Sequence, residues 1–273
     1  ITGDGVDDLV VGAPRASSGE ILVYAGSELY ALGWAVMFTA IATSETDAFG
    51  SALASGDVNG DGIADLIVGA PGANGLEDAT GAAYLFEGPL LTREADFPGT
   101  ARGDRMGASV DLDDLDGDGY ADAIIGAPGS DNGGLEAGLV TIVAGSSASV
   151  VAEEEVTLRG EQAGAQAGTS VAFAHDMNGD GNYDLVVGAP AYDAEDAIDA
   201  GRAYLVLGPV EGSHTLAASD HVTGYTTNMR LGLSVLGDTE LTGDSMADIV
   251  LGGPNTSYPE AEMTGIVLFL AGY

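Results

Sequence analysis

The sequence contains no lysine and no cysteine, and both absences limit what the protein can do. Its 273 residues carry seven basic side chains, all of them arginine, against 43 acidic ones, and the formal charge is −36 at pH 7. Nucleic acids and anionic membrane surfaces would be repelled, so neither is expected as a partner. Without cysteine there can be no disulfide, thiolate metal site or cysteine nucleophile, while the cellular compartment stays undecided.

Long apolar runs are missing as well. Glycine, proline or acidic residues interrupt every run well short of the roughly 20 residues that a membrane span needs, and no signal peptide opens the chain. We therefore expect no direct membrane insertion. Because 45% of the residues are apolar, the chain can bury a core and is not a disordered acidic tail.

An acidic, glycine-rich loop followed by an apolar run recurs along the chain. The clear copies are DVNGDGIADLIVGAP (57–71), DLDGDGYADAIIGAP (114–128) and DMNGDGNYDLVVGAP (176–190), and a degraded copy is ELTGDSMADIVLGGP (240–254). The chain opens with ITGDGVDDLVVGAP, which aligns from the second position onward. The central aspartates of successive copies are 57, 57, 62 and 64 residues apart. The chain is therefore a repeat protein.

Two further elements recur in phase with this loop. A Gly-Ser element precedes four of the copies, at 49–55, 106–112, 167–173 and 231–237, and a glycine-bounded apolar segment follows all five, at 19–26, 81–88, 138–145, 201–208 and 265–272. These short runs are rich in Val, Ile, Leu and Tyr, which indicates strands. A weaker fourth strand fits 34–42 and 153–160. Four antiparallel strands per repeat predict an all-β fold, a β-propeller with about five blades in this chain.

The acidic loop has the donor set of a cation site. Side-chain oxygens recur at loop positions one, three, five and nine, which in the clearest copy are Asp57, Asn59, Asp61 and Asp65. The glycines between them allow the positive φ angles of a tight curl, which brings these side chains together. Converging carboxylates repel one another unless a hard cation lies among them, and an all-oxygen set suits Ca²⁺ better than Zn²⁺ or copper. Mg²⁺ stays open, although it usually takes fewer protein ligands.

Two other calcium motifs do not fit this loop. An EF-hand needs a glutamate at its twelfth position and a helix beyond it. That position is Val68, Ile125 or Val187 in the three clear copies, inside a strand-like run. Nonapeptide β-helices fail because the loops recur every 57 to 64 residues.

This combination resembles the FG-GAP repeat of integrin α-subunit propellers, and the chain looks like a prokaryotic-type member. Phe49-Gly50 supplies the FG element and Gly69-Ala70-Pro71 the GAP element, with the acidic loop between them. The resemblance implies a β-propeller with Ca²⁺ in the loops between the first and second strands of its blades, an extracellular or cell-surface location, and a role in adhesion or ligand binding. The sequence departs from the pattern at Met106-Gly107, Ala167-Gly168, Leu231-Gly232 and Gly252-Gly253-Pro254.

The resemblance also implies the Ca²⁺ ligands. Three loops carry the full set: Asp57, Asn59, Asp61 and Asp65; Asp114, Asp116, Asp118 and Asp122; Asp176, Asn178, Asp180 and Asp184. The first loop keeps Thr2, Asp4 and Asp8 and lacks the first-position ligand, and the fifth offers Glu240, Thr242, Asp244 and Asp248. We expect three Ca²⁺ sites and up to five.

The repeats are expected to form one propeller domain or segment, divided at 1–48, 49–105, 106–166, 167–230 and 231–273. In this register the first repeat lacks its first strand and the fifth its fourth. The chain is therefore expected to be a segment of a longer protein, such as a seven-bladed propeller, and a five-bladed ring with one incomplete blade is the alternative. Self-association through open blade edges is a third possibility.

No catalytic constellation accompanies the loops. His175 adjoins Asp176 without a serine or cysteine in a nucleophile frame. We predict a non-enzymatic, extracellular adhesion or ligand-binding module whose partner is an extracellular protein or glycan. The alternative is a polysaccharide-active propeller enzyme or its carbohydrate-binding accessory domain. The loops after Gly-Ala-Pro vary most, and variable loops on a rigid scaffold are where binding usually occurs; for any one of these acidic loops, however, solvation of the surface is the favoured interpretation. Arg102-Gly103-Asp104, a tripeptide that some integrins recognise, is expected to occur here by chance.

Overall fold

The computed structural model describes residues 1–15, 19–29, 38–41, 47–74, 79–89, 91–147, 151–239, 241–243, 246–258 and 261–272. These residues fold almost entirely into strands, with one short α-helix, α1 (Gly26–Leu29), and one 3₁₀ helix, η1 (Leu216–Ala218). The all-β class predicted from the sequence is confirmed. Within the described ranges no helix is long and apolar enough to cross a membrane.

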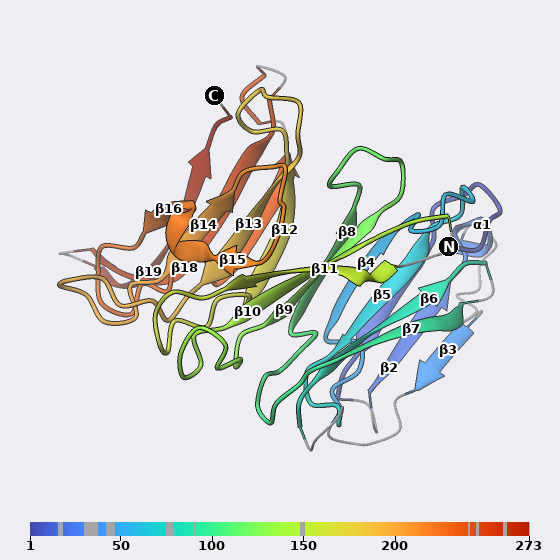
Figure 1. Cartoon of the computed structure of the whole chain (residues 1–273), viewed down its shortest axis with the longest axis horizontal. Coiled ribbons are helices and arrows are strands. Elements are labelled where there is room, and N and C mark those ends of the chain that lie inside the picture. Colours follow the sequence, from blue (N-terminus) through green and yellow to red (C-terminus); the bar gives the residue numbers. More distant parts are fainter. Residues whose placement is uncertain are drawn as a thin grey trace.

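The strands form five sheets, numbered here 1 to 5 in chain order (Figure 1). Sheet 1 contains β1 (Leu9–Ala13), β2 (Glu20–Tyr24) and β3 (Phe38–Ile41); sheet 2 contains β4 (Ala52–Gly56), β5 (Asp65–Ala70), β6 (Ala82–Glu87) and β7 (Thr92–Pro98). Sheet 3 contains β8 (Ser109–Asp113), β9 (Asp122–Ala127), β10 (Leu139–Ala144), β11 (Val151–Arg159) and the short β15 (His214–Thr215). Sheet 4 contains β12 (Ser170–His175), β13 (Asp184–Ala189), β14 (Arg202–Val206) and β16 (Asp220–Thr223), and sheet 5 contains β17 (Ser234–Thr239), β18 (Asp248–Tyr258) and β19 (Ala261–Leu270).

Neighbouring strands within each sheet are antiparallel, as expected for propeller blades, and β15 is the exception because it runs parallel to β11. Sheets 2 and 4 have the four strands predicted for a repeat, and sheets 1 and 5 have three. The predicted fourth strands at 34–42 and 153–160 correspond to β3 and β11; residues 34–37 and 42 lie outside the described part of the chain.

The core lies between neighbouring sheets. The central strands β5, β9 and β13 are buried along their whole length, because the two faces of each pack against different sheets. In β13, for example, Leu185 and Val187 pack toward sheet 3 while Val186 packs toward sheet 5. The first strands of consecutive sheets also contact one another, β4 with β8, β8 with β12 and β12 with β17. Figure 1 shows the sheets side by side, with sheet 1 (blue) and sheet 5 (red) at opposite ends.

Paired glycines set how closely two sheets approach. A Cβ atom on Gly69, the glycine of one GAP element, would lie 2.1 Å from the carbonyl oxygen of Gly107, which begins the next Gly-Ser element. Gly107 itself has φ of +80°, a conformation that side chains rarely adopt. The same contact joins Gly126 to Gly168 and Gly188 to Gly232. The glycine of a GAP element and the glycine of the next Gly-Ser element therefore meet where sheet 2 packs on sheet 3, sheet 3 on sheet 4, and sheet 4 on sheet 5.

Candidate metal centres

Each full acidic loop lies where it was predicted, between the first and second strands of its sheet. Residues 57–64 join β4 to β5, residues 114–121 join β8 to β9, and residues 176–183 join β12 to β13. All three loops curl in the same way, so one of them can be described in detail.

The first aspartate of the loop organises its curl. One carboxylate oxygen of Asp57, Oδ1, accepts hydrogen bonds from the amides of Gly60 (2.8 Å) and Asp61 (3.1 Å), and Oδ2 accepts one from Gly62 (2.8 Å). Asp114 and Asp176 accept the equivalent three bonds in their own loops. This carboxylate therefore closes the loop around itself through local side-chain-to-backbone bonds.

The third and fifth positions are oriented by the amides that follow them. Asn59 Oδ1 accepts from the amide of Asp61 at 3.0 Å, and Asp61 Oδ1 accepts from the amide of Ile63 at 2.8 Å. Both side chains are at the surface, and one oxygen of Asp61 takes no part in this bond. Asp116 and Asp118, and likewise Asn178 and Asp180, make the same bonds.

The ninth position is a buried anchor. Asp65 and Asp184 are fully buried and Asp122 is 3% exposed. Asp65 Oδ2 accepts from the amide of Val58 at 3.0 Å, and its Oδ1 accepts from the amide of Gly88, past the end of β6, at 2.9 Å. Burial raises the pKa of Asp65 from 3.8 to about 6 although these amide donors lower it, and the charge of Asp61 raises it further. Burial raises the pKa of Asp122 to about 6 and that of Asp184 in the same direction.

The acidic side chains converge most clearly in the loop of sheet 3. Carboxylate oxygens of Asp114, Asp116 and Asp122 all lie within 4.8 Å of one another. Burial, followed by the charges of Asp118 and Asp114, raises the pKa of Asp116. In the part of the chain that the structure describes, no arginine forms an ion pair with the acids of the three full loops. An all-oxygen, negatively charged donor set of this kind fits a hard divalent cation.

The first and fifth loops differ from the full ones. Asp8 accepts from the amides of Thr2 (2.8 Å) and Gly26 (3.0 Å), and Asp4 accepts from the hydroxyl of Ser27 at 2.6 Å. Asp248 accepts from the amides of Leu241 and Thr242. Burial alone would raise the pKa of Asp8, but its amide donors lower it; the amide of Leu241 likewise lowers the pKa of Asp248. Glu240 and Asp244 lie outside the described residues, so the fifth site stays a prediction.

A model of the FG-GAP repeat matches the chain at residues 49–86, 106–143 and 167–206. Each match begins at the Gly-Ser element and ends in the third strand of a sheet, with one acidic loop inside it. The chain belongs to the integrin α-like FG-GAP repeat family. The resemblance to the FG-GAP repeat family drawn from the sequence is thereby confirmed, whereas the prokaryotic type stays a prediction.

The relatives of this FG-GAP protein include integrin subunits and an enzyme. It is 28% identical over 244 residues to integrin alpha pat-2 of Caenorhabditis briggsae, covering 83% of this chain and 19% of the relative. It is 35% identical over 192 residues to human integrin alpha-7, covering 67% and 15%. It is 31% identical over 174 residues to phosphatidylinositol-glycan-specific phospholipase D of Bos taurus, covering 61% and 20%. The chain thus spans a fifth or less of the length of these relatives.

In three pairs of neighbouring FG-GAP repeats the acidic loops touch each other, a contact that the sequence analysis did not predict. Tyr120, at the seventh position of its loop, lies over Gly60 of the preceding loop, where a Cβ atom would be 2.6 Å from the ring. The amide of Ala121 donates to the carbonyl of Asp57 at 2.8 Å. Ile63 lies beside Gly3, and Met246 beside Gly179, in the same way. The sequence feature that could have predicted these contacts is a bulky residue at the seventh position of the loop.

His175 also contacts both its own repeat and the preceding one. Its Nε2 lies 2.7 Å from Oδ2 of Asp113, and its ring stacks on Tyr183 with centroids 4.5 Å apart. Asp104 of the Arg-Gly-Asp tripeptide is 5% exposed, and its carboxylate accepts from the amides of Thr100 and Ala101. A buried, bonded carboxylate of this kind is not presented to a partner.

The loops after Gly-Ala-Pro lie at the opposite end of the second strands from the metal loops. Three of them are closed by a side-chain oxygen that accepts a hydrogen bond from a backbone amide: Asn74 from Ala79, Asp131 from Glu136, and Asp193 from Asp199, all at 2.8 Å. Two of these loops expose an aliphatic side chain, Leu135 (72% exposed) and Ile198 (66%), among acidic neighbours. Glu77 and Asp78 of the loop in sheet 2 lie outside the described residues.

Proposed function

We propose that this FG-GAP protein is a non-enzymatic, extracellular adhesion or ligand-binding module whose blades are stabilised by Ca²⁺. The observation that carries the metal part is the meeting of three carboxylates, those of Asp114, Asp116 and Asp122, within 4.8 Å of one another. The integrin subunits among its relatives support a cell-surface setting and a protein ligand, while a glycan ligand is the second candidate for the same surface.

The residues of each full loop have different roles in the proposed metal site. The first-position aspartate holds the curl, the third and fifth supply exposed oxygens, and the buried ninth-position aspartate ties the loop to the end of the third strand. Bound Ca²⁺ would supply the positive charge that offsets carboxylate repulsion. Because an ion held only by the folded state adds stability by mass action, the metal acts on stability first and on ligand binding through the rigid scaffold.

The proposed ligand surface is the rim formed by the loops after Gly-Ala-Pro. Hydrogen bonds from backbone amides to the carboxylates of Asp131 and Asp193 close two of these loops, and the side chains of Leu135 and Ile198 in the same loops are exposed to solvent. Exposed aliphatic side chains on a rigid loop are suited to contact with a partner.

The test is thermal unfolding with excess Ca²⁺ and with a chelator, together with metal counting after dialysis. We expect a large Ca²⁺-dependent shift in Tm and three bound ions, rising to five if the first and fifth loops also bind. Asp118→Ala should lose much of the shift. The matched control is Asp131→Ala, an exposed aspartate on the opposite rim, which should lower Tm equally with and without Ca²⁺. No bound metal and no shift in the parent protein would contradict the proposal.

One relative favours a second function. The similarity to a phospholipase D that acts on phosphatidylinositol glycans is consistent with a propeller that serves an enzyme, including a polysaccharide-active one, as its carbohydrate-binding part. Incubation with a glycan array followed by measurement of released reducing ends distinguishes the two functions. Bond cleavage would favour the enzyme, and retention without cleavage would favour the binding module.

A further inference from the structure

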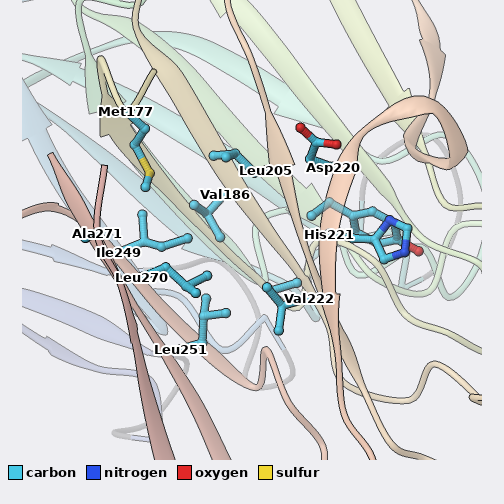
Figure 2. Close-up of a pocket in the computed structure, with 12 residues that line it drawn as sticks. Met177, Val186, Leu205, Asp220, His221, Val222, Ile249, Leu251, Leu270 and Ala271 are labelled. Carbon is cyan, nitrogen blue, oxygen red and sulfur yellow. The ribbon is translucent and has the colours of Figure 1, made fainter. Parts of the chain in front are cut away.

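A cavity of about 310 Å³ lies between sheets 4 and 5 (Figure 2). Its walls are mostly aliphatic, and Figure 2 shows the side chains of Val186, Leu205, Ile249 and Leu270 around the opening. The polar residues Asp220 and His221, both exposed, stand on one side of it. The cavity is therefore an apolar groove, open to solvent, between two propeller blades.

Sheets 3 and 4 form the same groove one repeat earlier. The repeat alignment and the strand registers make the wall residues equivalent in pairs. The pairs, with the residue of the earlier groove second, are Met177 and Leu115, Val186 and Ile124, Ala203 and Val140, Leu205 and Ile142, Val222 and Leu158, Ile249 and Leu185, Leu251 and Val187, and Leu270 and Val206. In each pair, the residue named second belongs to a single buried cluster between sheets 3 and 4.

The earlier groove is filled by a leucine from a connecting segment. Residues 207–219 join β14 to β16, and within them Leu216 is fully buried in the cluster between sheets 3 and 4, with Val210 packed against it. A further example lies between sheets 1 and 2, where Leu91, from the connection between β6 and β7, is 5% exposed in the shared cluster.

Strand addition holds Leu216 in place. Just before it, β15 pairs in parallel with the outer strand of sheet 3, His214 opposite Leu158 and Thr215 opposite Arg159. Ser213 Oγ accepts a hydrogen bond from the amide of Thr157 at 3.0 Å. The segment that fills this groove is thus a short polar strand followed by a leucine.

The later groove offers the same two features. Its outer strand β16 is an edge strand of sheet 4, and Val222 stands opposite Ala203 as Leu158 stands opposite Val140. The backbone of this edge can accept a further strand. Ala203 is smaller than its counterpart Val140, so the groove has room for a leucine side chain.

We propose that the groove between sheets 4 and 5 is a docking site for an extended peptide segment, of the kind that connects two strands within another FG-GAP repeat. The segment adds a short parallel strand to the edge of β16 and places the leucine that follows this strand in the cavity. The support for this proposal comes from the molecule itself, because residues 213–216 already fill the equivalent groove between sheets 3 and 4 in this way.

The test uses a synthetic peptide with the sequence of residues 207–219, LGPVEGSHTLAAS, added to the 273-residue protein with ¹³C-labelled methyl groups. We expect saturable shifts in the methyl signals of Leu205, Leu251 and Leu270, and none at Leu9 or Val11 of sheet 1. A peptide with alanine at the position of Leu216 should bind roughly tenfold more weakly or worse, because the side chain that fills the cavity is gone.

A matched pair of variants separates the groove from the rest of sheets 4 and 5. Val222→Asp places a charge on the groove wall and should abolish the shifts, whereas Val267→Asp, on the outward face of β19 (56% exposed), should leave them. If Val222→Asp does not fold, Ala203→Leu fills the groove instead and should also prevent binding. Equal binding of the leucine and alanine peptides, shifts spread over all sheets, or no saturable binding would overturn the proposal.

Discussion

The buried aspartate at the ninth position of each full loop destabilises the fold in its charged form when no cation is present. Asp65 and Asp122 sit in an environment that disfavours their charged form, and each is held by two amide donors that favour it. Burial prevails in the metal-free protein, where it raises the pKa values of both to about 6. These two residues therefore link the stability of the metal-free fold to pH.

The expected pH dependence has a definite sign. Because the folded pKa of Asp65 and Asp122 is raised above the unfolded value, the folded state binds more protons between about pH 4 and pH 6. Their contribution to stability is full below the unfolded pKa and is lost as the pH rises through the folded one. In chelator, the free energy of unfolding should fall over this window, and excess Ca²⁺ should remove or reverse the fall. Urea denaturation at several pH values measures it. A rise in chelator would contradict the raised pKa values.

Gly107 tests the close approach of sheets 2 and 3 and the positive φ angle that accompanies it. Gly107→Ala adds a Cβ atom 2.2 Å from the carbonyl oxygen of Ala82 at a residue with φ of +80°. Since both the clash and the backbone strain are imposed, we expect a loss of about 3 kcal/mol or more in the free energy of unfolding. Gly103→Ala is the control, because Gly103 has φ of +91° but open space around it; it should cost about 1 kcal/mol. Equal losses in urea denaturation would mean that φ alone matters.

At the scale of elements, several neighbouring acidic loops touch each other in pairs, among them the loops that begin at Asp57 and Asp114. Tyr120 lies over Gly60, and a backbone bond joins Ala121 to Asp57. Ordering of one loop by a cation is therefore expected to restrict its neighbour. The contact depends on the residue at the seventh loop position, because Gly117, which is equivalent to Gly60, has no such neighbour.

Tyr120→Ala is expected to weaken Ca²⁺ binding in two loops, its own and the one that begins at Asp57. The loss of packing over Gly60 should lower stability by about 1–2 kcal/mol in the presence of Ca²⁺. Asn182→Ala is the comparison at the same loop position. A Cβ on Gly117 of the preceding loop would meet nothing within 4 Å, and the Asn182 side chain donates to Asp180 of its own loop, so only that one site should weaken. Isothermal titration with Ca²⁺ compares them. If only one site weakens in Tyr120→Ala, the loops bind independently.

At the scale of the whole molecule, the formal charge of −36 is the dominant feature. Few of the acids are paired by the seven arginines; Arg202 reaches Glu161 and Arg93 reaches Asp96 among the described residues. Self-repulsion of this size destabilises a compact state.

Monovalent salt should therefore substitute in part for calcium. In chelator, raising NaCl from about 0.02 M to about 1 M shortens the Debye length to about 3 Å, so Tm should rise. With Ca²⁺ in the loops, the same change in salt should raise Tm less, because the most crowded carboxylates are already neutralised. Differential scanning calorimetry compares the four conditions. A salt effect of equal size with and without Ca²⁺ would place the repulsion outside the metal loops.

Much of this fold follows from local pattern. Alternating acids and glycines between Asp57 and Asp65 close a loop through bonds within the loop itself, so the curl was predictable from sequence. The runs after each loop are apolar on both faces, which indicated strands buried between two sheets. The constant order of the recurring elements along each repeat predicted the order of the strands in each sheet, because consecutive strands pair with one another.

By itself, the sequence determined the class of fold, the positions of the strands around each acidic loop and the residues of the candidate metal loops, because these depend on neighbours along the chain. Only the tertiary structure decided which loops touch, that Asp104 is buried, and that β15 leaves its own sheet to pair with β11. The grooves between sheets were likewise decided there, since their walls come from residues far apart in sequence and their filling depends on a connecting segment. Contacts between repeats carry no local pattern, and close packing alone fixes them.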